Sequence, residues 1–249
     1  MTGSISVQAT DHVAIVEMHR PPNNFFDEAL LGELAEALLA LDDDLDVRSV
    51  VLCSEGKHFC AGAQLGGMTP EGIRRVYRHA FSVFTTRHPI VAAVQGSAVG
   101  GGLGLALAAD FRVATPESRF VANFARLGFH QGFGLSVTLP VLVGQQRALG
   151  LLLTGRDVFG SEALEIGLCD RLAPADTREA AFELADAIAQ SAPLSIISIR
   201  ATMRRPLIAD VYAALDTEAQ AQAALLPTAD FGEGIEAARA RRAPVFRGA

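Results

Sequence analysis

The sequence predicts an α/β fold, with a parallel sheet built from alternating strands and helices and a helical C-terminal part. Short apolar segments rich in β-branched residues alternate with segments of helical spacing, and this order builds a parallel sheet with right-handed crossovers. From Asp176 onward the pattern is mostly helical. We expect residues 1–192 to form the α/β core and residues 193–249 the helical region.

The strands are predicted from alternation or from short apolar runs. The first two strands flank Thr10-Asp11-His12, and this pattern predicts a hairpin. The predicted strands are residues 5–9, 13–18, 47–53, 90–94, 111–115, 120–123 and 168–172.

The helices are predicted from apolar residues at helical spacing and from end signals. Asp27 can cap the first helix, which would run through Leu41 and end at a solvated acidic triplet, Asp42-Asp43-Asp44. The later helices are residues 71–87, 102–109, 132–143, 145–153, 161–167, 176–190, 193–205, 208–226 and 230–242.

The stretch from Ile90 to Asp110 predicts a buried strand, a glycine turn and a buried helix. After Gly102 almost no polar side chain follows for two turns, so this helix should lie inside the protein. Gly100 to Gly102 leave backbone N–H groups unobstructed at a helix start, where the partial charge is positive. A group that gains negative charge could bind there, although the same glycines would also suit tight packing of helix on strand.

Composition excludes several classes of function. The 249 residues carry a net charge of −7, which argues against general nucleic-acid binding and requires local cations or backbone groups for any anionic ligand. The segment 91–109 comes closest to a membrane span, but its glycines argue against one. Met1 to Ser4 shows no secretory signal, and three cysteines without a C-x-x-C pair are expected to be free thiols, so we expect a cytoplasmic protein.

Common catalytic signatures are absent from the sequence. There is no G-x-x-x-x-G-K-[ST], no G-x-S-x-G around a serine and no H-E-x-x-H. Gly100-x-Gly102 lacks the third glycine of a dinucleotide fingerprint. The six histidines show no metal-ligand spacing, so we expect no metal site.

A second segment, Phe59-Cys60-Ala61-Gly62-Ala63-Gln64-Leu65, also presents backbone N–H groups among small residues after a buried strand. Together with Gly96 to Gly102 it resembles the crotonase family, that is, the enoyl-CoA hydratase/isomerase superfamily. Further motifs in family order are Arg20-Pro21 followed by Asn24, Ala109-Asp110, Leu139-Pro140 before Val143-Gly144, Leu153-Thr154-Gly155, Ala163 with Gly167-Leu168, and Arg242-Ala243-Pro244-Val245-Phe246-Arg247-Gly248.

The resemblance implies a crotonase-like spiral of ββα units with a helical C-terminal trimerisation region, and a homotrimer or homohexamer. It implies an acyl-CoA substrate, with coenzyme A as part of that substrate and no separate cofactor. By position, the N–H groups of Ala63 and Gly101 match the oxyanion hole, which stabilises an enolate. The residues that fall where the family holds coenzyme A are Arg20, Pro22, Asn23, Ala61, Gln64 (where the family usually has Asp) and Leu65.

This chain departs from the family at the two glutamates with which a hydratase handles water. Gly104 and Phe124 stand at those positions, and neither can take or deliver a proton. The best-placed substitute is His130, next to Gln131 at the expected acyl pocket, although a loop histidine held by hydrogen bonds is the alternative. Tyr77 and His79 on the preceding helix are further candidates.

Phe124 and Phe129 are expected to line an apolar acyl pocket or to fill core, and Gly104 and Gln131 to border the same pocket. Three functions stay open: a hydratase or isomerase homologue, a family enzyme of another reaction such as thioester or carbon–carbon hydrolysis or decarboxylation, and a non-catalytic acyl-CoA-binding protein. The sequence does not identify the acyl group.

Overall fold

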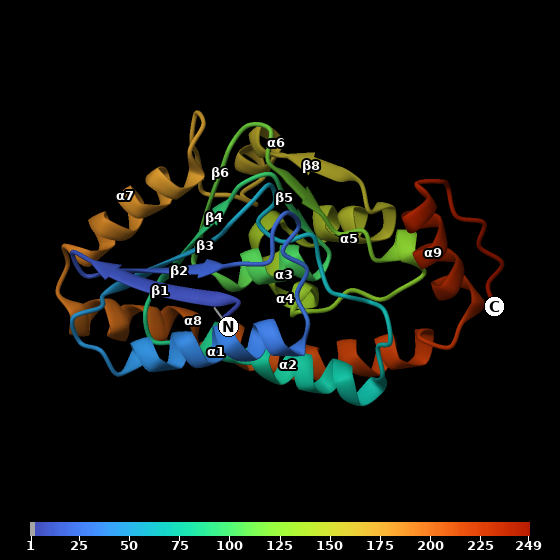
Figure 1. The fold of residues 1–249 in the computed structure, drawn as a ribbon, viewed down its shortest axis with the longest axis horizontal. Coiled ribbons are helices and arrows are strands. Elements are labelled where there is room, and N and C mark those ends of the chain that lie inside the picture. The colour runs from blue at the N-terminus through green and yellow to red at the C-terminus, as the bar shows by residue number, and fades with distance from the viewer. Residues whose placement is uncertain (1–2) are drawn as a thin grey trace.

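The computed structural model describes residues 3–249 and contains two sheets (Figure 1). Met1 and Thr2, which begin the segment inspected for a secretory signal, lie outside the described residues. The larger sheet has the order β1 (Ile5–Thr10), β2 (Val13–Met18), β3 (Ser49–Ser54), β4 (Ile90–Val94), β6 (Phe111–Ala114) and β9 (Arg171–Leu172). The smaller sheet has the order β5 (Ser97–Val99), β7 (Arg119–Val121) and β8 (Asp157–Phe159).

The predicted α/β class and the predicted hairpin are confirmed. β1 pairs antiparallel with β2, and β2, β3, β4, β6 and β9 pair in parallel. The helical elements are α1 (Glu28–Asp42), α2 (Pro70–Thr85), α3 (Gly101–Ala108), η1 (Ala125–Leu127), α4 (Leu135–Val143), α5 (Gln145–Thr154), α6 (Gly160–Glu165), α7 (Thr177–Ala189), α8 (Pro193–Leu225) and α9 (Ala229–Ala240).

The central strands β3 and β4 of the larger sheet are buried on both faces, as their uninterrupted apolar sequences require, whereas the edge strand β1 is largely exposed. Val51, Val91 and Val113 pack against α7, whereas Leu52 and Ala92 belong to the main core with α1, α2 and α3. Figure 1 shows α7 on one side of this sheet and α1, α2 and α8 on the other.

Residues 193–225 form one helix, α8, rather than the two helices that we predicted. Pro206 lies inside α8, between the two predicted segments 193–205 and 208–226. Val211 and Leu215 of α8 join the main core, so this helix packs against α2 and α4. In residues 3–249 no helix combines the length and apolar character needed to cross a membrane.

Two buried carboxylates hold helix ends. Asp110, which follows α3, accepts hydrogen bonds from Arg200 Nε and Arg204 Nη1, each at 2.9 Å. Asp42 at the end of α1 accepts from Thr86 Oγ1 and from the Arg87 N–H, each at 2.7 Å. The expectation of a merely solvated acidic terminus is therefore wrong for Asp42, because distant donors reach it.

Candidate active site

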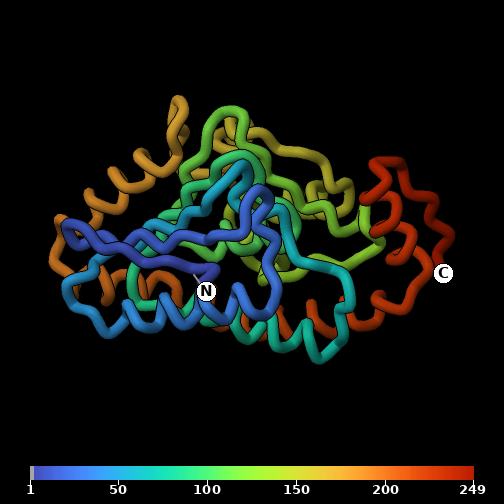
Figure 2. The backbone as a smooth tube through the Cα atoms, viewed as in Figure 1, coloured from blue at the N-terminus to red at the C-terminus, as the bar shows by residue number. Residues whose placement is uncertain are grey.

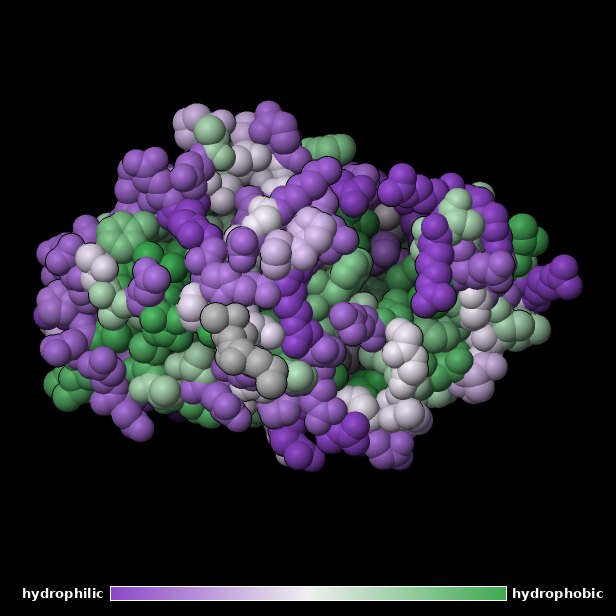
Figure 3. All heavy atoms as spheres, in the orientation of Figure 1, coloured by the Kyte–Doolittle hydropathy of each residue, from purple (hydrophilic) through white to green (hydrophobic). Residues whose placement is uncertain are grey.

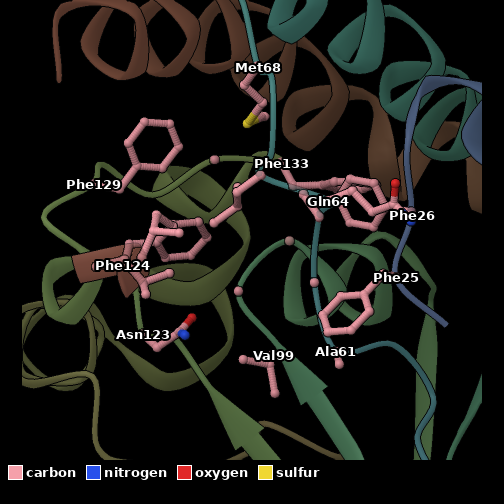
Figure 4. Close-up of a pocket in the computed structure, with 18 of the residues that line it drawn as sticks. Phe25, Phe26, Ala61, Gln64, Met68, Val99, Asn123, Phe124, Phe129 and Phe133 are labelled. Carbon is pink, nitrogen blue, oxygen red and sulfur yellow. The ribbon is translucent and has the colours of Figure 1, made fainter. Parts of the chain in front are cut away.

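A cavity of about 610 Å³ lies between the Ala61–Leu65 segment, the start of α3, the segment around η1, and helices α2, α8 and α9. Its wall is mostly apolar, and phenylalanines from four parts of the chain contribute to it (Figure 4). On the face of the molecule drawn in Figure 3, hydrophobic residues gather in a hollow beside the C-terminal elements.

Two segments predicted to present backbone N–H groups are joined by a parallel bridge between Cys60 and Ala98. The Cys60 N–H donates to Ser97 O at 3.1 Å, and the Val99 N–H donates to Cys60 O at 3.0 Å. A Cβ on Gly102 would stand 2.1 Å from Cys60 O, so only glycine permits this approach. Ala63 and Gly101 each lie three residues beyond this bridge, and both line the cavity.

The N–H groups of Ala63 and Gly101 have no hydrogen-bond acceptor within residues 3–249. Gly101 opens α3, where an N–H has no partner inside the helix. Ala63 forms a parallel bridge with Phe26, in which Gly62 O and the Gln64 N–H are paired with Phe26 at 3.0 and 2.8 Å. The N–H of Ala63 points away from that bridge. The cavity wall therefore carries two unpaired donors.

Phe26 contacts both donor residues. Its backbone pairs with the strand around Ala63, and its ring lies so close to Gly101 that a Cβ there would be 2.5 Å from the ring Cζ. The ring also packs edge-on against Phe133, with the centroids 5.6 Å apart. One residue thus contacts both donor segments, Ala63 through its backbone and Gly101 through its ring.

The two positions at which the resemblance implies glutamates in a hydratase hold Gly104 and Phe124. Phe124 lines the cavity, whereas Gly104, contrary to expectation, does not. Phe133 covers Gly104, since a Cβ on this glycine would be 2.4 Å from Phe133 Cβ. Within the described chain, the cavity wall contains no aspartate, glutamate, histidine or lysine.

Tyr77 and Gln222 form a polar corner in this apolar wall. The Tyr77 hydroxyl donates to Gln222 Oε1 at 2.8 Å, and Gln222 Nε2 donates to His130 O at 2.9 Å. Burial raises the pKa of Tyr77 well above its ordinary value, so the phenol stays protonated at neutral pH. Tyr77 was a candidate from its helix position, but no sequence signal pointed to Gln222, which α8 brings in from the far end of the chain.

His130 and Gln131 do not line the cavity, contrary to expectation. His130 Nδ1 is 2.7 Å from Gln131 O, and Gln131 Nε2 donates to Ser136 Oγ at 3.1 Å. The alternative of a hydrogen-bonded loop histidine describes these surroundings. His79 packs on Gly32 of α1 and is also outside the cavity wall.

The residues expected to hold coenzyme A divide into two groups. Ala61, Gln64 and Leu65 line the cavity, as does Phe129 of the expected acyl pocket. Arg20, Pro22 and Asn23 do not line it.

Arg20, Pro22 and Asn23 form polar contacts with other residues of the chain. Arg20 Nη1 is 2.7 Å from Asp27 Oδ1, and Arg20 Nε donates to Ser4 Oγ at 3.2 Å. The carbonyl of Pro22 accepts from the N–H groups of Lys57 and His58, and that of Asn23 accepts from Ala61.

A buried carboxylate, Glu218, lies behind the polar corner. It accepts hydrogen bonds from the N–H groups of Gly134 at 2.8 Å and Ser136 at 2.9 Å, at the start of α4. Burial raises its pKa. Glu218 therefore holds the loop that presents Phe133, and it does not reach the cavity wall.

The protein is therefore an α/β protein in which a mostly parallel sheet, a second small sheet and a buried helix that begins at Gly101 accompany an apolar cavity. The sequence profile described as enoyl-CoA hydratase/isomerase matches residues 8–249. The chain belongs to this family, the crotonase superfamily.

Similar proteins agree with this family along nearly the whole chain. An enoyl-CoA isomerase/hydratase of Zymoseptoria tritici is 33% identical, and the match covers 98% of this chain and 87% of that protein. The solved structure of an enoyl-CoA hydratase from Mycobacterium avium subsp. paratuberculosis has a TM-score of 0.90 at 28% identity, covering 98% of this chain and 99% of that one. The solved structure of an enoyl-CoA hydratase/isomerase from Pseudoalteromonas atlantica has a TM-score of 0.89 at 31% identity, covering 98% of this chain and 100% of that one.

Proposed function

We propose that the protein is an acyl-CoA-processing enzyme that holds the thioester carbonyl oxygen between the N–H groups of Ala63 and Gly101. The observation that carries this proposal is the pair of unpaired donors in the wall of an apolar cavity. Such a pair stabilises the negative charge of an enolate, and one such donor is typically worth about 3 to 4 kcal/mol in a transition state.

The reaction is one that needs no pair of carboxylates beside the acyl group. Hydration of an enoyl thioester requires a group that takes a proton from water and a group that delivers one to carbon. Phe124 and the Phe133 ring over Gly104 supply neither. We therefore propose slow hydration, and a main reaction of another kind such as thioester or carbon–carbon hydrolysis or decarboxylation.

A non-catalytic acyl-CoA-binding protein is the second candidate. It is favoured by one observation, that the cavity wall of the described chain has no carboxylate or imidazole. Tyr77 is then a polar contact for the bound acyl group rather than an acid.

The carbonyl stretch of bound thioesters tests the proposed donors directly. A saturated acyl-CoA with a ¹³C-labelled thioester carbonyl should show a lower stretching frequency when bound than when free, because two hydrogen bonds polarise the C=O bond. Binding without any shift, or no binding in calorimetry, would contradict the proposal.

Turnover assays separate the remaining functions. Loss of enoyl absorbance with crotonyl-CoA should be slow, and a panel of acyl-CoAs should reveal the main reaction through free thiol or carbon dioxide release. Fast hydration, on the order of 10³ s⁻¹, would contradict the role we give to Gly104 and Phe124. A bound, polarised thioester with no turnover across the panel would favour the binding protein.

We also propose that the chain assembles as a homotrimer or homohexamer. α8 leaves Leu194, Ile199 and Met203 with 70%, 64% and 75% of their surface exposed in the single chain. Exposed apolar side chains in such number mark an association surface. Light scattering that reports a stable monomer at micromolar concentration would contradict this assembly.

A further inference from the structure

Arg239, in the last turn of α9, is the one charged side chain in the cavity wall among the described residues. Every other residue of that wall is apolar or neutral and polar. Because the chain has a net charge of −7, an anionic group would be held in this cavity only where a local cation offsets the repulsion.

The Arg239 guanidinium has no ion-pair partner in residues 3–249. Arg242, which follows α9, by contrast pairs with Glu233 of α9, with Nη1 2.5 Å from Oε1. A cation in a last turn interacts favourably with the helix dipole wherever its head group points. The dipole thus explains an arginine at the end of α9, but it does not explain an unpaired guanidinium in the wall of the cavity.

Arg239 lies at the opposite end of the cavity from the Ala61–Leu65 segment. Figure 4 shows Ala61 and Phe25 on one side of the cavity and Phe124 and Phe129 on the other. α9 packs on η1, next to Phe124, so closely that a Cβ on Gly234 would be 2.4 Å from Leu127 O. Figure 2 shows the C-terminal segment beside this part of the chain.

Both proposed donors, Ala63 and Gly101, lie in the cavity wall, and Ala63 belongs to the Ala61–Leu65 segment at the end opposite α9. If the thioester carbonyl binds there and coenzyme A occupies the end formed by Ala61, Gln64 and Leu65, the acyl group extends towards Phe124 and α9. We propose that this acyl group ends in a carboxylate, which pairs with Arg239, so that the substrate is the mono-CoA thioester of a dicarboxylic acid. This inference rests on the proposed function.

The chemistry of the two ends fits such a substrate. The apolar wall formed by Phe124, Leu127 and Phe129 suits the methylene chain between the two carboxyl groups. A guanidinium binds a carboxylate with two parallel hydrogen bonds, which a methyl terminus cannot accept. The arginine is exposed, so water screens the pair, and we expect a preference of about 5-fold rather than several hundred-fold.

Calorimetry with matched thioesters tests this inference. Succinyl-, glutaryl- and adipyl-CoA are compared with butanoyl-, pentanoyl- and hexanoyl-CoA, which have the same numbers of carbons. In the wild type, at least one of the charged thioesters should bind about 5-fold more tightly than its uncharged partner. Arg239→Gln should remove that preference and leave the uncharged thioesters unaffected.

Arg241→Gln is the matched control, because Arg241 is an exposed arginine two residues away that does not line the cavity. It should leave the preference intact, whereas an equal loss in both variants would show a general field effect and overturn the inference. The inference is also overturned if no charged thioester binds to the wild type more tightly than its uncharged partner.

Thioesters of 3′-dephospho-coenzyme A distinguish the other source of an anion. If Arg239→Gln weakens charged and uncharged thioesters equally, and the effect disappears with the dephospho compounds, Arg239 binds the coenzyme phosphate and the inference is wrong. If no thioester of either kind binds to the wild type, the proposed function itself fails, and this inference fails with it.

Discussion

Replacement of Gly101 by alanine should impair the donor pair while leaving the protein folded. The added Cβ would stand 2.5 Å from Phe26 Cζ and 2.8 Å from Cε1. Carbon atoms in contact lie about 3.5 to 4.0 Å apart, so the ring or the start of α3 must move by about 1 Å. Phe26 is 2% exposed and packs on Phe133, so the ring has little room to move, and the start of α3 shifts.

The expected energies separate function from stability. Overpacking costs about 1 to 3 kcal/mol, and replacing glycine in a helix recovers up to about 1 kcal/mol. The free energy of unfolding should therefore fall by at most about 3 kcal/mol. A displacement of about 1 Å at a catalytic group can cost about 100-fold in rate, so turnover should fall by about that factor.

The assay combines thermal unfolding with two functional readouts, turnover of the acyl-CoA found in the panel and the carbonyl shift of bound thioester. Phe26→Leu in the Gly101→Ala background should restore part of both, because the smaller side chain makes room for the new methyl group. Gly66→Ala is the control, since Gly66 lines the same cavity with no atom within 4 Å of an added Cβ. A Gly101→Ala protein with the full carbonyl shift and full turnover would refute the geometry that we assign to the donors.

Three further predictions follow from buried groups. Gly104→Glu with Phe124→Glu should not give hydratase activity on crotonyl-CoA, because a Cβ at position 104 would be 2.4 Å from Phe133 Cβ. Adding Phe133→Gly, which also suits the φ of 61° at that residue, should give hydratase activity. A folded triple variant without hydration would contradict this account. Asp110→Ala should lower the free energy of unfolding, measured with urea, by about 3 to 5 kcal/mol, because it leaves Arg200 and Arg204 buried without their carboxylate. The control Glu183→Ala breaks the exposed pair with Arg171 and should lower it by less than about 1 kcal/mol. Burial raises the pKa of Glu218 above 4.5, so the folded state binds this proton more tightly than the unfolded state does. The resulting stabilisation is complete below pH 4.5 and is lost as the pH rises through the folded pKa. The stability of the wild type relative to Glu218→Gln should therefore fall over that range, and a constant or rising difference would contradict the assignment.

Local patterns were sufficient for most of the fold. The hairpin, the Asp27 cap of α1 and the buried helix α3 were predicted because each depends on periodicity or on a cap within a few residues. β5 and β8, each of three residues, were missed. The single helix α8 was missed because its packing against α2 and α4 keeps residues around Pro206 helical.

The candidate site was predictable only where its chemistry depends on the backbone. Small residues around Ala63 and Gly101 showed in the sequence that two main-chain segments approach something closely. The cover of Phe133 over Gly104 and the arrival of Gln222 and Arg239 in the cavity wall depend on how separate elements pack. Sequence spacing carries no signal for such contacts, so the choice of His130 over Tyr77 could not be corrected without the fold.

The order in which the cavity walls occur along the chain has a consequence for synthesis. A nascent chain that has left the ribosome as far as α7 already contains both N–H donors, but the wall that α8 and α9 supply is still missing. Tyr77 then has no Gln222 to accept its hydrogen bond, and Asp110 at the end of α3 has no arginine from α8. The buried helix α3 gains the two arginine contacts at its far end only when α8 has been made, so a truncated product exposes apolar surface and is prone to aggregate.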